Sequence, residues 1–252
     1  MLKKFVFERI IPFFGSLYTR KNKFINVIYY HDIVNGNGYG SQQTDLELFK
    51  NHMNYIKSKN FSTYTFDELE NNENLLYSND TVLITFDDGW VSNYSEIFDF
   101  MKDLNIKYNI FLEVGKIGAD PNYLTWDMVR EMYSSGIVGF GAHTFSHPDM
   151  SDLSIIDTEK EFLLANKKIT DETGIIPKDF CYPFGKYSEQ TNKYILDNTD
   201  YTRIYTSKMM YSYKKYNKIV FGRNSINGDR PFSVFINMLK GNYAIFNTIR
   251  RK

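Results

Sequence analysis

Short apolar segments that alternate with amphipathic helical patterns limit the fold of this chain more than any other feature of its sequence. The helical patterns cover residues 45–59, 91–104, 125–135, 154–172, 187–198 and 231–240. The strand-like segments, most of them apolar throughout as buried parallel strands are, cover residues 24–30, 82–86, 108–114, 137–142, 180–182, 201–206 and 219–221. This alternation predicts an α/β fold with a parallel sheet, and seven strands favour closure into a barrel. Functional residues are then expected after the C-terminal ends of the strands.

Charge balance and cysteine content narrow the function classes. The 30 basic residues equal the 30 acidic ones, so no net positive field favours a nucleic-acid partner. Cys181 is the one cysteine, which excludes an internal disulfide framework and a multi-cysteine zinc site. No repeat or long linker divides the chain, which predicts a single domain over residues 24–252 after a separate segment of residues 1–23.

Residues 1–23 combine basic and apolar side chains. They begin as an export signal does, but Glu8 and Arg9 interrupt the apolar stretch. The uncharged run that follows is too short to span a bilayer. Basic residues among Phe, Ile and Leu suit peripheral contact with an anionic membrane surface, and a plain packed helix is the alternative. The basic residues are Lys3, Lys4, Arg9, Arg20, Lys21 and Lys23.

Two adjacent carboxylates, Asp87 and Asp88, follow the apolar strand 82–86 and precede Gly89. Neighbouring acids repel each other and resist burial unless a cation or a shared proton compensates them. Paired carboxylates at a strand end therefore indicate a metal or acid–base site. A solvated turn with a helix-capping aspartate is the alternative.

Two of the four histidines, His143 and His147, follow another apolar strand, 137–142. Imidazole pairs at this spacing suit zinc or a related divalent ion, and one added carboxylate leaves coordination positions open for water and substrate. Because both clusters are expected at the same edge of the sheet, together they predict one metal site.

Four segments together resemble the polysaccharide deacetylase family with the NodB homology domain, also called carbohydrate esterase family 4. The segments are residues 27–32 (VIYYHD), 85–89 (TFDDG), 143–148 (HTFSHP) and 180–185 (FCYPFG). The resemblance covers residues 24–240, and the pattern is most similar to members that deacetylate poly-N-acetylglucosamine. It implies a distorted (β/α) barrel of about seven parallel strands and a divalent ion that assists removal of acetyl groups from sugars.

By motif position, the resemblance makes Asp88, His143 and His147 the metal ligands and Asp87 the general base. It assigns the backbone N–H of Phe184, the residue after the third motif's proline, to the oxyanion. The ion is expected to be zinc, and the same ligands accept cobalt, nickel, manganese or iron.

The sequence departs from the family pattern at two places. Cys181 stands where an arginine usually orients the base, and no histidine follows His147 to act as the usual general acid. His31, at the end of the first strand, is the expected acid, with a buried structural histidine as the alternative; His52 is expected to be structural. Arg223 is a candidate for the missing arginine and for the substrate site, and otherwise an ion-pair or helix-end residue.

Trp90, Tyr182 and Phe184 are candidates for an apolar platform beneath a sugar ring, with core packing as the alternative. The chain is expected to be a metal-dependent hydrolase that removes N-acetyl groups from an N-acetylhexosamine-containing polysaccharide or glycan intermediate. The alternatives are hydrolysis of another, cyclic amide and a non-catalytic carbohydrate-binding descendant. Lack of a clear export signal favours a cytoplasmic or membrane-peripheral location, although many family members act outside the cytoplasm.

Overall fold

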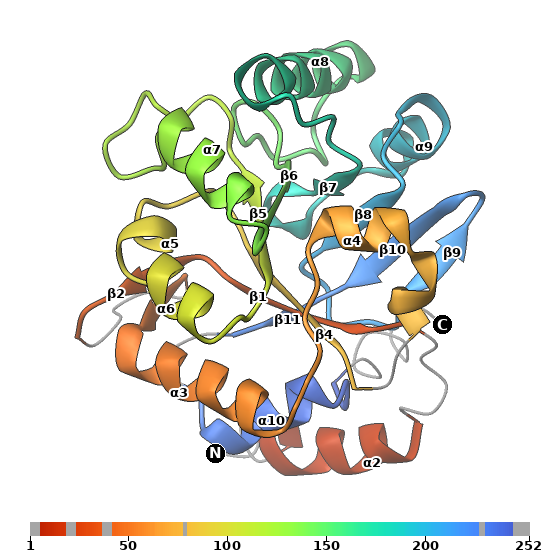
Figure 1. Ribbon diagram of the computed structural model, residues 1–252. Coiled ribbons are helices and arrows are strands. Elements are labelled where there is room, and N and C mark those ends of the chain that lie inside the picture. The colour runs from red at the N-terminus through yellow and green to blue at the C-terminus, as the bar shows by residue number, and fades with distance from the viewer. Residues whose placement is uncertain (1–5, 19–23, 37–41, 78–79, 227–229, 244–252) are drawn as a thin grey trace.

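A parallel sheet surrounded by helices forms the centre of the molecule (Figure 1). The computed structural model describes residues 6–18, 24–36, 42–77, 80–226 and 230–243. The strand order is β11-β1-β4-β5-β6-β7-β8-β10-β9, and every neighbouring pair is parallel except β10 and β9. The strands are β1 Asn26–Tyr30, β4 Val82–Phe86, β5 Tyr108–Leu112, β6 Val138–Ala142, β7 Asp179–Cys181, β8 Arg203–Thr206, β9 Tyr213–Lys215, β10 Lys218–Gly222 and β11 Asn224–Ser225.

β10 and β11 are two parts of one interrupted strand. They connect the beginning of this order, at β11, with its far side, where β10 lies between β8 and β9. Only Arg223 separates β10 from β11. β10 pairs with β8, whereas β11 pairs with β1, with Tyr29 opposite Ser225. If β10 and β11 are counted as one strand, the pairing returns to β1 after seven strands. The predicted α/β fold with about seven parallel strands is confirmed.

Helices cover the outside of the sheet, and several begin at capping residues that the sequence displays. Asp45, Thr125, Ser154 and Ser188 each accept a hydrogen bond from the backbone N–H three residues later. The helices are α2 Ile11–Tyr18, α3 Leu46–Ser58, α4 Phe66–Asn71, α5 Ser92–Ser95, α6 Phe98–Asp103, α7 Trp126–Ser134, α8 Ile155–Thr173, α9 Glu189–Asn198 and α10 Phe232–Leu239. A π-helical turn, Val6–Ile10, precedes α2, and 3-10 turns cover Glu73–Tyr77 and Pro183–Gly185.

The helix expected over residues 91–104 is wrong as a single element. It is divided into α5 and α6, and Ile97 between them leaves helical geometry. Ser92 and Asn93 instead direct their side chains to the chain after β1: Ser92 Oγ donates to Asp32 at 2.8 Å, and Asn93 Nδ2 donates to the His31 carbonyl at 3.0 Å. These hydrogen bonds attach α5 to the segment that follows β1. The short elements α4, β9, β11 and a two-stranded sheet of β2 Asp32–Val34 and β3 Gln43–Asp45 were not expected.

Alternation along the strands creates two cores. On β1, Ile28 and Tyr30 belong to the large cluster beneath the helices, whereas Val27 belongs to a smaller cluster. The smaller cluster joins residues of β1, β4, β5, β7, β8 and β10 with Phe66 of α4, as the interior of a closed sheet does. Polar residues that continue the inward-facing rows beyond this cluster therefore meet at the C-terminal ends of the strands.

Candidate active site

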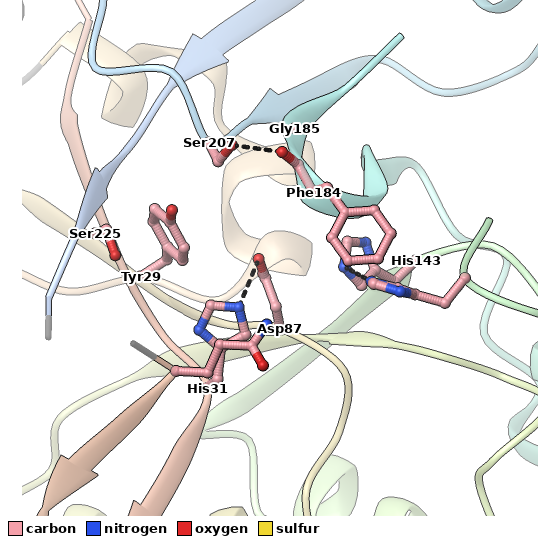
Figure 2. Close-up of a pocket in the computed structure, with 10 residues that line it drawn as sticks. Tyr29, His31, Asp87, His143, Phe184, Gly185, Ser207 and Ser225 are labelled. Carbon is pink, nitrogen blue, oxygen red and sulfur yellow. Dashed lines mark hydrogen bonds and ion pairs between the residues drawn. The ribbon is translucent and has the colours of Figure 1, made fainter. Parts of the chain in front are cut away.

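The expected site residues meet at the C-terminal ends of the parallel strands. His31 follows β1, Asp87 and Asp88 follow β4, and His143 follows β6. Figure 2 shows His31, Asp87, His143 and Phe184 around one cavity, whose volume is about 270 Å³. His147 also lines this cavity.

Asp88, His143 and His147 each direct one ligand atom toward a common point. Asp88 Oδ1 lies 3.5 Å from His143 Nε2 and 3.4 Å from His147 Nε2, and the two nitrogens are 3.2 Å apart. A tetrahedral zinc ion with bonds of about 2.0–2.1 Å holds its ligand atoms about 3.3 Å from one another. Asp88 Oδ1 is also buried without a hydrogen-bond partner among the described residues. These three residues therefore fit a divalent ion.

Hydrogen bonds orient two of these side chains. His143 Nδ1 lies 2.8 Å from the Cys181 carbonyl oxygen, which accepts a hydrogen bond from the Nδ1–H group. In this tautomer His143 Nε2 carries no proton, and its lone pair is available to a metal ion. Burial lowers the pKa of His143 to about 3, so the imidazole is neutral, as a metal ligand must be. Trp90 Nε1 donates to Asp88 Oδ2 at 3.1 Å, which leaves Oδ1 for the common point.

The backbone of the site is strained. Four non-glycine residues have positive φ: Asp88 (74°), Thr144 (67°), His147 (56°) and Phe184 (55°). Such conformations cost about 1–3 kcal/mol each for these residue types and persist where the surrounding structure imposes them. Their concentration around one cavity is typical of a functional site.

Asp87 forms the strongest ion pair of the site, with Arg223. Arg223 Nη1 and Nη2 donate to the two carboxylate oxygens at 2.7 Å each, and Arg223 is fully buried. Burial alone would raise the pKa of Asp87, but the charge and hydrogen bonds of Arg223 outweigh it and hold the pKa well below its usual value. Asp87 is therefore a carboxylate at neutral pH.

Arg223 also contacts most of the other strands around the interior. It donates to Thr85 Oγ1 at 3.2 Å and to the Thr206 carbonyl at 3.3 Å, and Nη2 lies 2.9 Å from Cys181 Sγ. Its guanidinium carbon lies 4.2 Å from the centre of the Tyr29 ring. The guanidinium thus occupies the space beside Cys181, where the family pattern places an arginine of the third motif.

His31 lies beside Asp87 in the wall of the cavity (Figure 2). Its Nε2 lies 4.0 Å from Asp87 Oδ2, and its ring packs edge-on against Tyr29. Its side chain is 15% exposed, so it is reachable from the cavity. His52 lies elsewhere: it is buried in α3, stacked on Phe235 at 3.9 Å between ring centres.

The residues expected to bind substrate are placed differently from one another. Phe184 is 55% exposed, lines the cavity and packs edge-on against His147. Trp90 stacks on Tyr123 and donates a hydrogen bond to Asp88, so its ring supports the Asp88–His143–His147 cluster. Tyr182 is 1% exposed, and its hydroxyl donates to Asn192; the suggested sugar platform at Tyr182 is corrected to core packing. Arg223 is likewise buried behind Asp87, so direct substrate contact by Arg223 is corrected.

Sequence reasoning missed other residues of the cavity wall. Tyr29, Gln42, Ser207 and Ser225 also line the cavity. Tyr29 was recognisable, because it lies two residues before His31 and side chains two apart on a strand share a face. The serines follow β8 or lie in the short strand β11, and no local pattern in the sequence marks them.

Glu113 was also not predicted as a residue near the site, because the sequence pattern placed it inside a strand over residues 108–114. β5 instead ends at Leu112, so Glu113 is the first residue after the strand. The Glu113 backbone N–H donates to the Asp88 carbonyl at 3.0 Å. Burial raises the pKa of its carboxyl group.

Known proteins share both sequence and fold with this chain. Residues 77–204, half of the chain, match the family model described as polysaccharide deacetylase. The putative polysaccharide deacetylase YxkH of Bacillus subtilis is 31% identical over 182 residues, which are 69% of this chain and 62% of YxkH. The peptidoglycan-N-acetylglucosamine deacetylase PgdA of Listeria monocytogenes is 26% identical over 114 residues, 45% of this chain and 23% of PgdA. The chain thus spans less than two thirds of these relatives.

A solved structure extends the fold comparison beyond the matched residues. The Streptococcus pyogenes deacetylase PplD, in complex with acetate, has a TM-score of 0.75 at 20% identity, covering 85% of this chain and 98% of PplD. At this identity the likeness establishes the shared fold. Because the family model itself matches half of the sequence, including Asp87 and all three residues of the Asp88–His143–His147 cluster, the chain belongs to the polysaccharide deacetylase family.

Proposed function

We propose that this protein is a metal-dependent hydrolase that removes N-acetyl groups from a glycan containing N-acetylhexosamine. The observation that carries the proposal is that the Asp88–His143–His147 cluster and the Asp87–His31 pair lie at the same cavity. Relatives named as a peptidoglycan-N-acetylglucosamine deacetylase and as chitin deacetylases support an N-acetylglucosamine polymer as substrate.

Asp88, His143 and His147 would hold one divalent ion, with zinc as the first candidate and cobalt, nickel and manganese as alternatives. When bound, such an ion polarises an amide carbonyl and brings the pKa of a water molecule toward neutrality. Asp88 Oδ1 is buried and has no hydrogen-bond partner among the described residues, which supports this assignment, because burying such a carboxylate oxygen is costly without a cation.

Asp87 is the proposed general base. Its carboxylate is ionised at neutral pH and can take the proton of the water that attacks the acetyl carbon. Arg223 holds both oxygens of Asp87 and so fixes the plane of the carboxylate, which makes Arg223 a positioning residue.

His31 is the proposed general acid. Breaking the bond between the carbonyl carbon and the sugar nitrogen releases acetate, and the nitrogen leaves as an amine only if it gains a proton. His31 lines the same cavity as Asp87, with 4.0 Å between His31 Nε2 and Asp87 Oδ2, and can supply that proton. The Phe184 backbone N–H would stabilise the oxyanion, and its exposed ring would contact the sugar.

Two alternatives make different predictions. A non-catalytic carbohydrate binder would bind glycan without releasing acetate. A hydrolase of a different, cyclic amide would release no acetate from N-acetylglucosamine oligomers. The Arg223–Asp87 contact argues for a catalyst, because Arg223 can orient Asp87 in place of the arginine that is absent at position 181.

The test measures acetate release from N-acetylglucosamine oligomers by chelated protein to which zinc, cobalt, nickel or manganese is returned. We expect metal-dependent release, its loss in Asp87→Asn with metal content unchanged, and loss of bound metal in His143→Ala. Metal binding without acetate release from any oligomer would contradict the proposed substrate. Failure to bind any of the four ions would overturn the mechanism.

Peripheral contact with a membrane through residues 1–23, and with it a membrane-peripheral location, is part of the proposal. Within the described residues, none of the helices combines the length and the apolar character that crossing a bilayer demands.

A further inference from the structure

The strongest surface feature outside the cavity lies where the first helix meets the last. Ile10, Phe13 and Phe14 are 38%, 64% and 51% exposed. They stand at positions i, i+3 and i+4, so they form one apolar face on the π-helical turn and α2. Soluble surfaces rarely keep two phenylalanines so exposed side by side, and such a patch indicates a binding surface.

A groove of about 610 Å³ runs beside this face. It is lined from α2 and the preceding turn by Arg9, Pro12 and Phe13, and from α10 and its C-terminal end by Lys240. The remaining lining residues are the acidic Glu8 and the polar Ser233, Asn237 and Asn242. Two exposed cations, amide and hydroxyl groups beside an exposed apolar face match the two parts of a phospholipid, its anionic headgroup and its acyl chains.

The charge of the sequence agrees with this surface. Residues 1–23 carry six basic residues and one acidic residue, whereas the whole chain is balanced at 30 of each. Cations on this segment would be attracted to an anionic lipid surface at about 1 kcal/mol each, or about fivefold in affinity.

We propose that the α2–α10 face, defined as Arg9, Ile10, Phe13, Phe14 and Lys240, docks the protein on an anionic phospholipid bilayer. Arg9 and Lys240 then meet lipid phosphates in the groove. Ile10, Phe13 and Phe14 enter the boundary between headgroups and acyl chains.

The position of this face decides which way the cavity points. Asn26, the first residue of β1, donates to the Leu239 carbonyl at the end of α10 at 3.0 Å. Gly15 of α2 approaches the Asn242 carbonyl so closely that a Cβ would lie 1.7 Å from it. His31 follows the other end of β1, about 13 Å farther along a five-residue strand. The docking face therefore lies toward the strand starts, and the cavity opens at the strand ends.

This orientation deepens the proposed function, on which it rests. A docked protein holds its cavity away from the bilayer. It therefore reaches acetylated residues of a glycan polymer that extends from the membrane, in preference to a sugar joined directly to a lipid headgroup.

The first test is sedimentation of the full chain with phosphatidylcholine vesicles, with or without phosphatidylglycerol. We expect binding only to the anionic vesicles at 0.1 M salt and its loss at 0.5 M. Phe13→Ser with Phe14→Ser should weaken binding at least tenfold, and Arg9→Gln or Lys240→Gln about fivefold each. Leu163→Ser with Leu164→Ser, which alters exposed apolar residues of α8, is the matched control and should bind as wild type.

Vesicle binding that is unchanged in the Phe13/Phe14 double variant would overturn the proposal, as would absence of binding by wild type. A dimer that this variant abolishes would assign the face to a second copy of the chain instead. The variant should still release acetate from soluble oligomers at the wild-type rate. If wild type releases none, the proposed function fails while the vesicle result stands.

The orientation has its own test on the same vesicles. We expect faster acetate release from an anchored N-acetylglucosamine polymer than from a short lipid-linked N-acetylglucosamine. The reverse preference would overturn the orientation.

Discussion

Arg223 holds both carboxylate oxygens of Asp87 at 2.7 Å, although the two residues lie 136 positions apart in the chain. Arg223 occupies the single break between β10 and β11, the point at which the sheet returns to β1. One side chain therefore links the closure of the fold to the orientation of the proposed base.

Replacing Arg223 with methionine should destabilise the protein by about 3–5 kcal/mol, because it leaves the buried Asp87 without its counter-charge. Deacetylation should fall with it. Arg223→Lys should recover part of the stability but little of the turnover, since an ammonium group does not hold two oxygens in one plane. Urea unfolding and turnover of the same preparations test this, and wild-type stability in Arg223→Met would refute it.

An arginine at position 181 should be able to take over the role of Arg223 beside Asp87. Cys181 Sγ lies 2.9 Å from Arg223 Nη2, and the family pattern places its arginine at this position. Cys181→Arg combined with Arg223→Ala should therefore be more active than Arg223→Ala alone. Cys181→Arg with Arg223 retained should be the least stable protein, because two guanidinium groups would share one buried site. Equal activities of the double variant and Arg223→Ala would show that the position of the guanidinium matters beyond its charge.

Chelation should lower the melting temperature by several degrees. Ligand at 100 times its dissociation constant stabilises a folded protein by about 2.7 kcal/mol. Asp88→Asn should abolish the response to added zinc, because it removes the negative charge of Asp88 Oδ1, which has no hydrogen-bond partner in the described part of the chain. His31→Ala is the control, since His31 is outside the ligand cluster and its variant should keep the full zinc response. Differential scanning calorimetry with and without zinc makes the measurement.

His52 should make stability depend on pH. Burial lowers its pKa to about 3, below the ordinary value of 6.5 that it regains on unfolding. Between these values the unfolded chain binds a proton that the folded one does not, so stability is complete above pH 6.5 and is lost as pH falls. The loss amounts to about 2 kcal/mol between pH 6.5 and 5.

The variant His52→Gln keeps a polar group beside the Tyr30 hydroxyl, which lies 3.1 Å from His52 Nδ1. Arg230, which lines the same small cavity as His52, is unchanged in this variant. Urea unfolding at pH 7, 6 and 5 should show a flatter profile for the variant than for wild type. Parallel profiles would mean that His52 is not the group that titrates.

Phe184 should separate stability from substrate binding. Its φ of 55° is strained for phenylalanine, and its ring is more than half exposed at the cavity. Phe184→Gly should relieve about 1 kcal/mol of strain, whereas Phe184→Ala keeps it. Both variants should raise KM for oligomers because the ring is gone. A KM that matches wild type in both would exclude the ring from substrate contact.

Local sequence patterns were enough to predict the strands and the groups of neighbouring reactive side chains. Apolar runs are local, so the seven parallel strands were found, and Asp87–Asp88 and His143–His147 are close enough in sequence to be recognised as clusters. Capping residues such as Ser154 are likewise visible in the sequence, because each bonds to an N–H three residues away.

Tertiary structure decided what depends on distant partners. Whether Arg223 met Asp87 or substrate, and whether Tyr182 faced the cavity or the core, depended on how strands far apart in sequence were placed around one interior. The hydrogen bonds from α5 to Asp32 and to the His31 carbonyl likewise join residues 60 and 62 positions apart in the chain. Local periodicity reports which face of a strand a residue occupies, but the partner across the interior is set by the packing of the whole sheet.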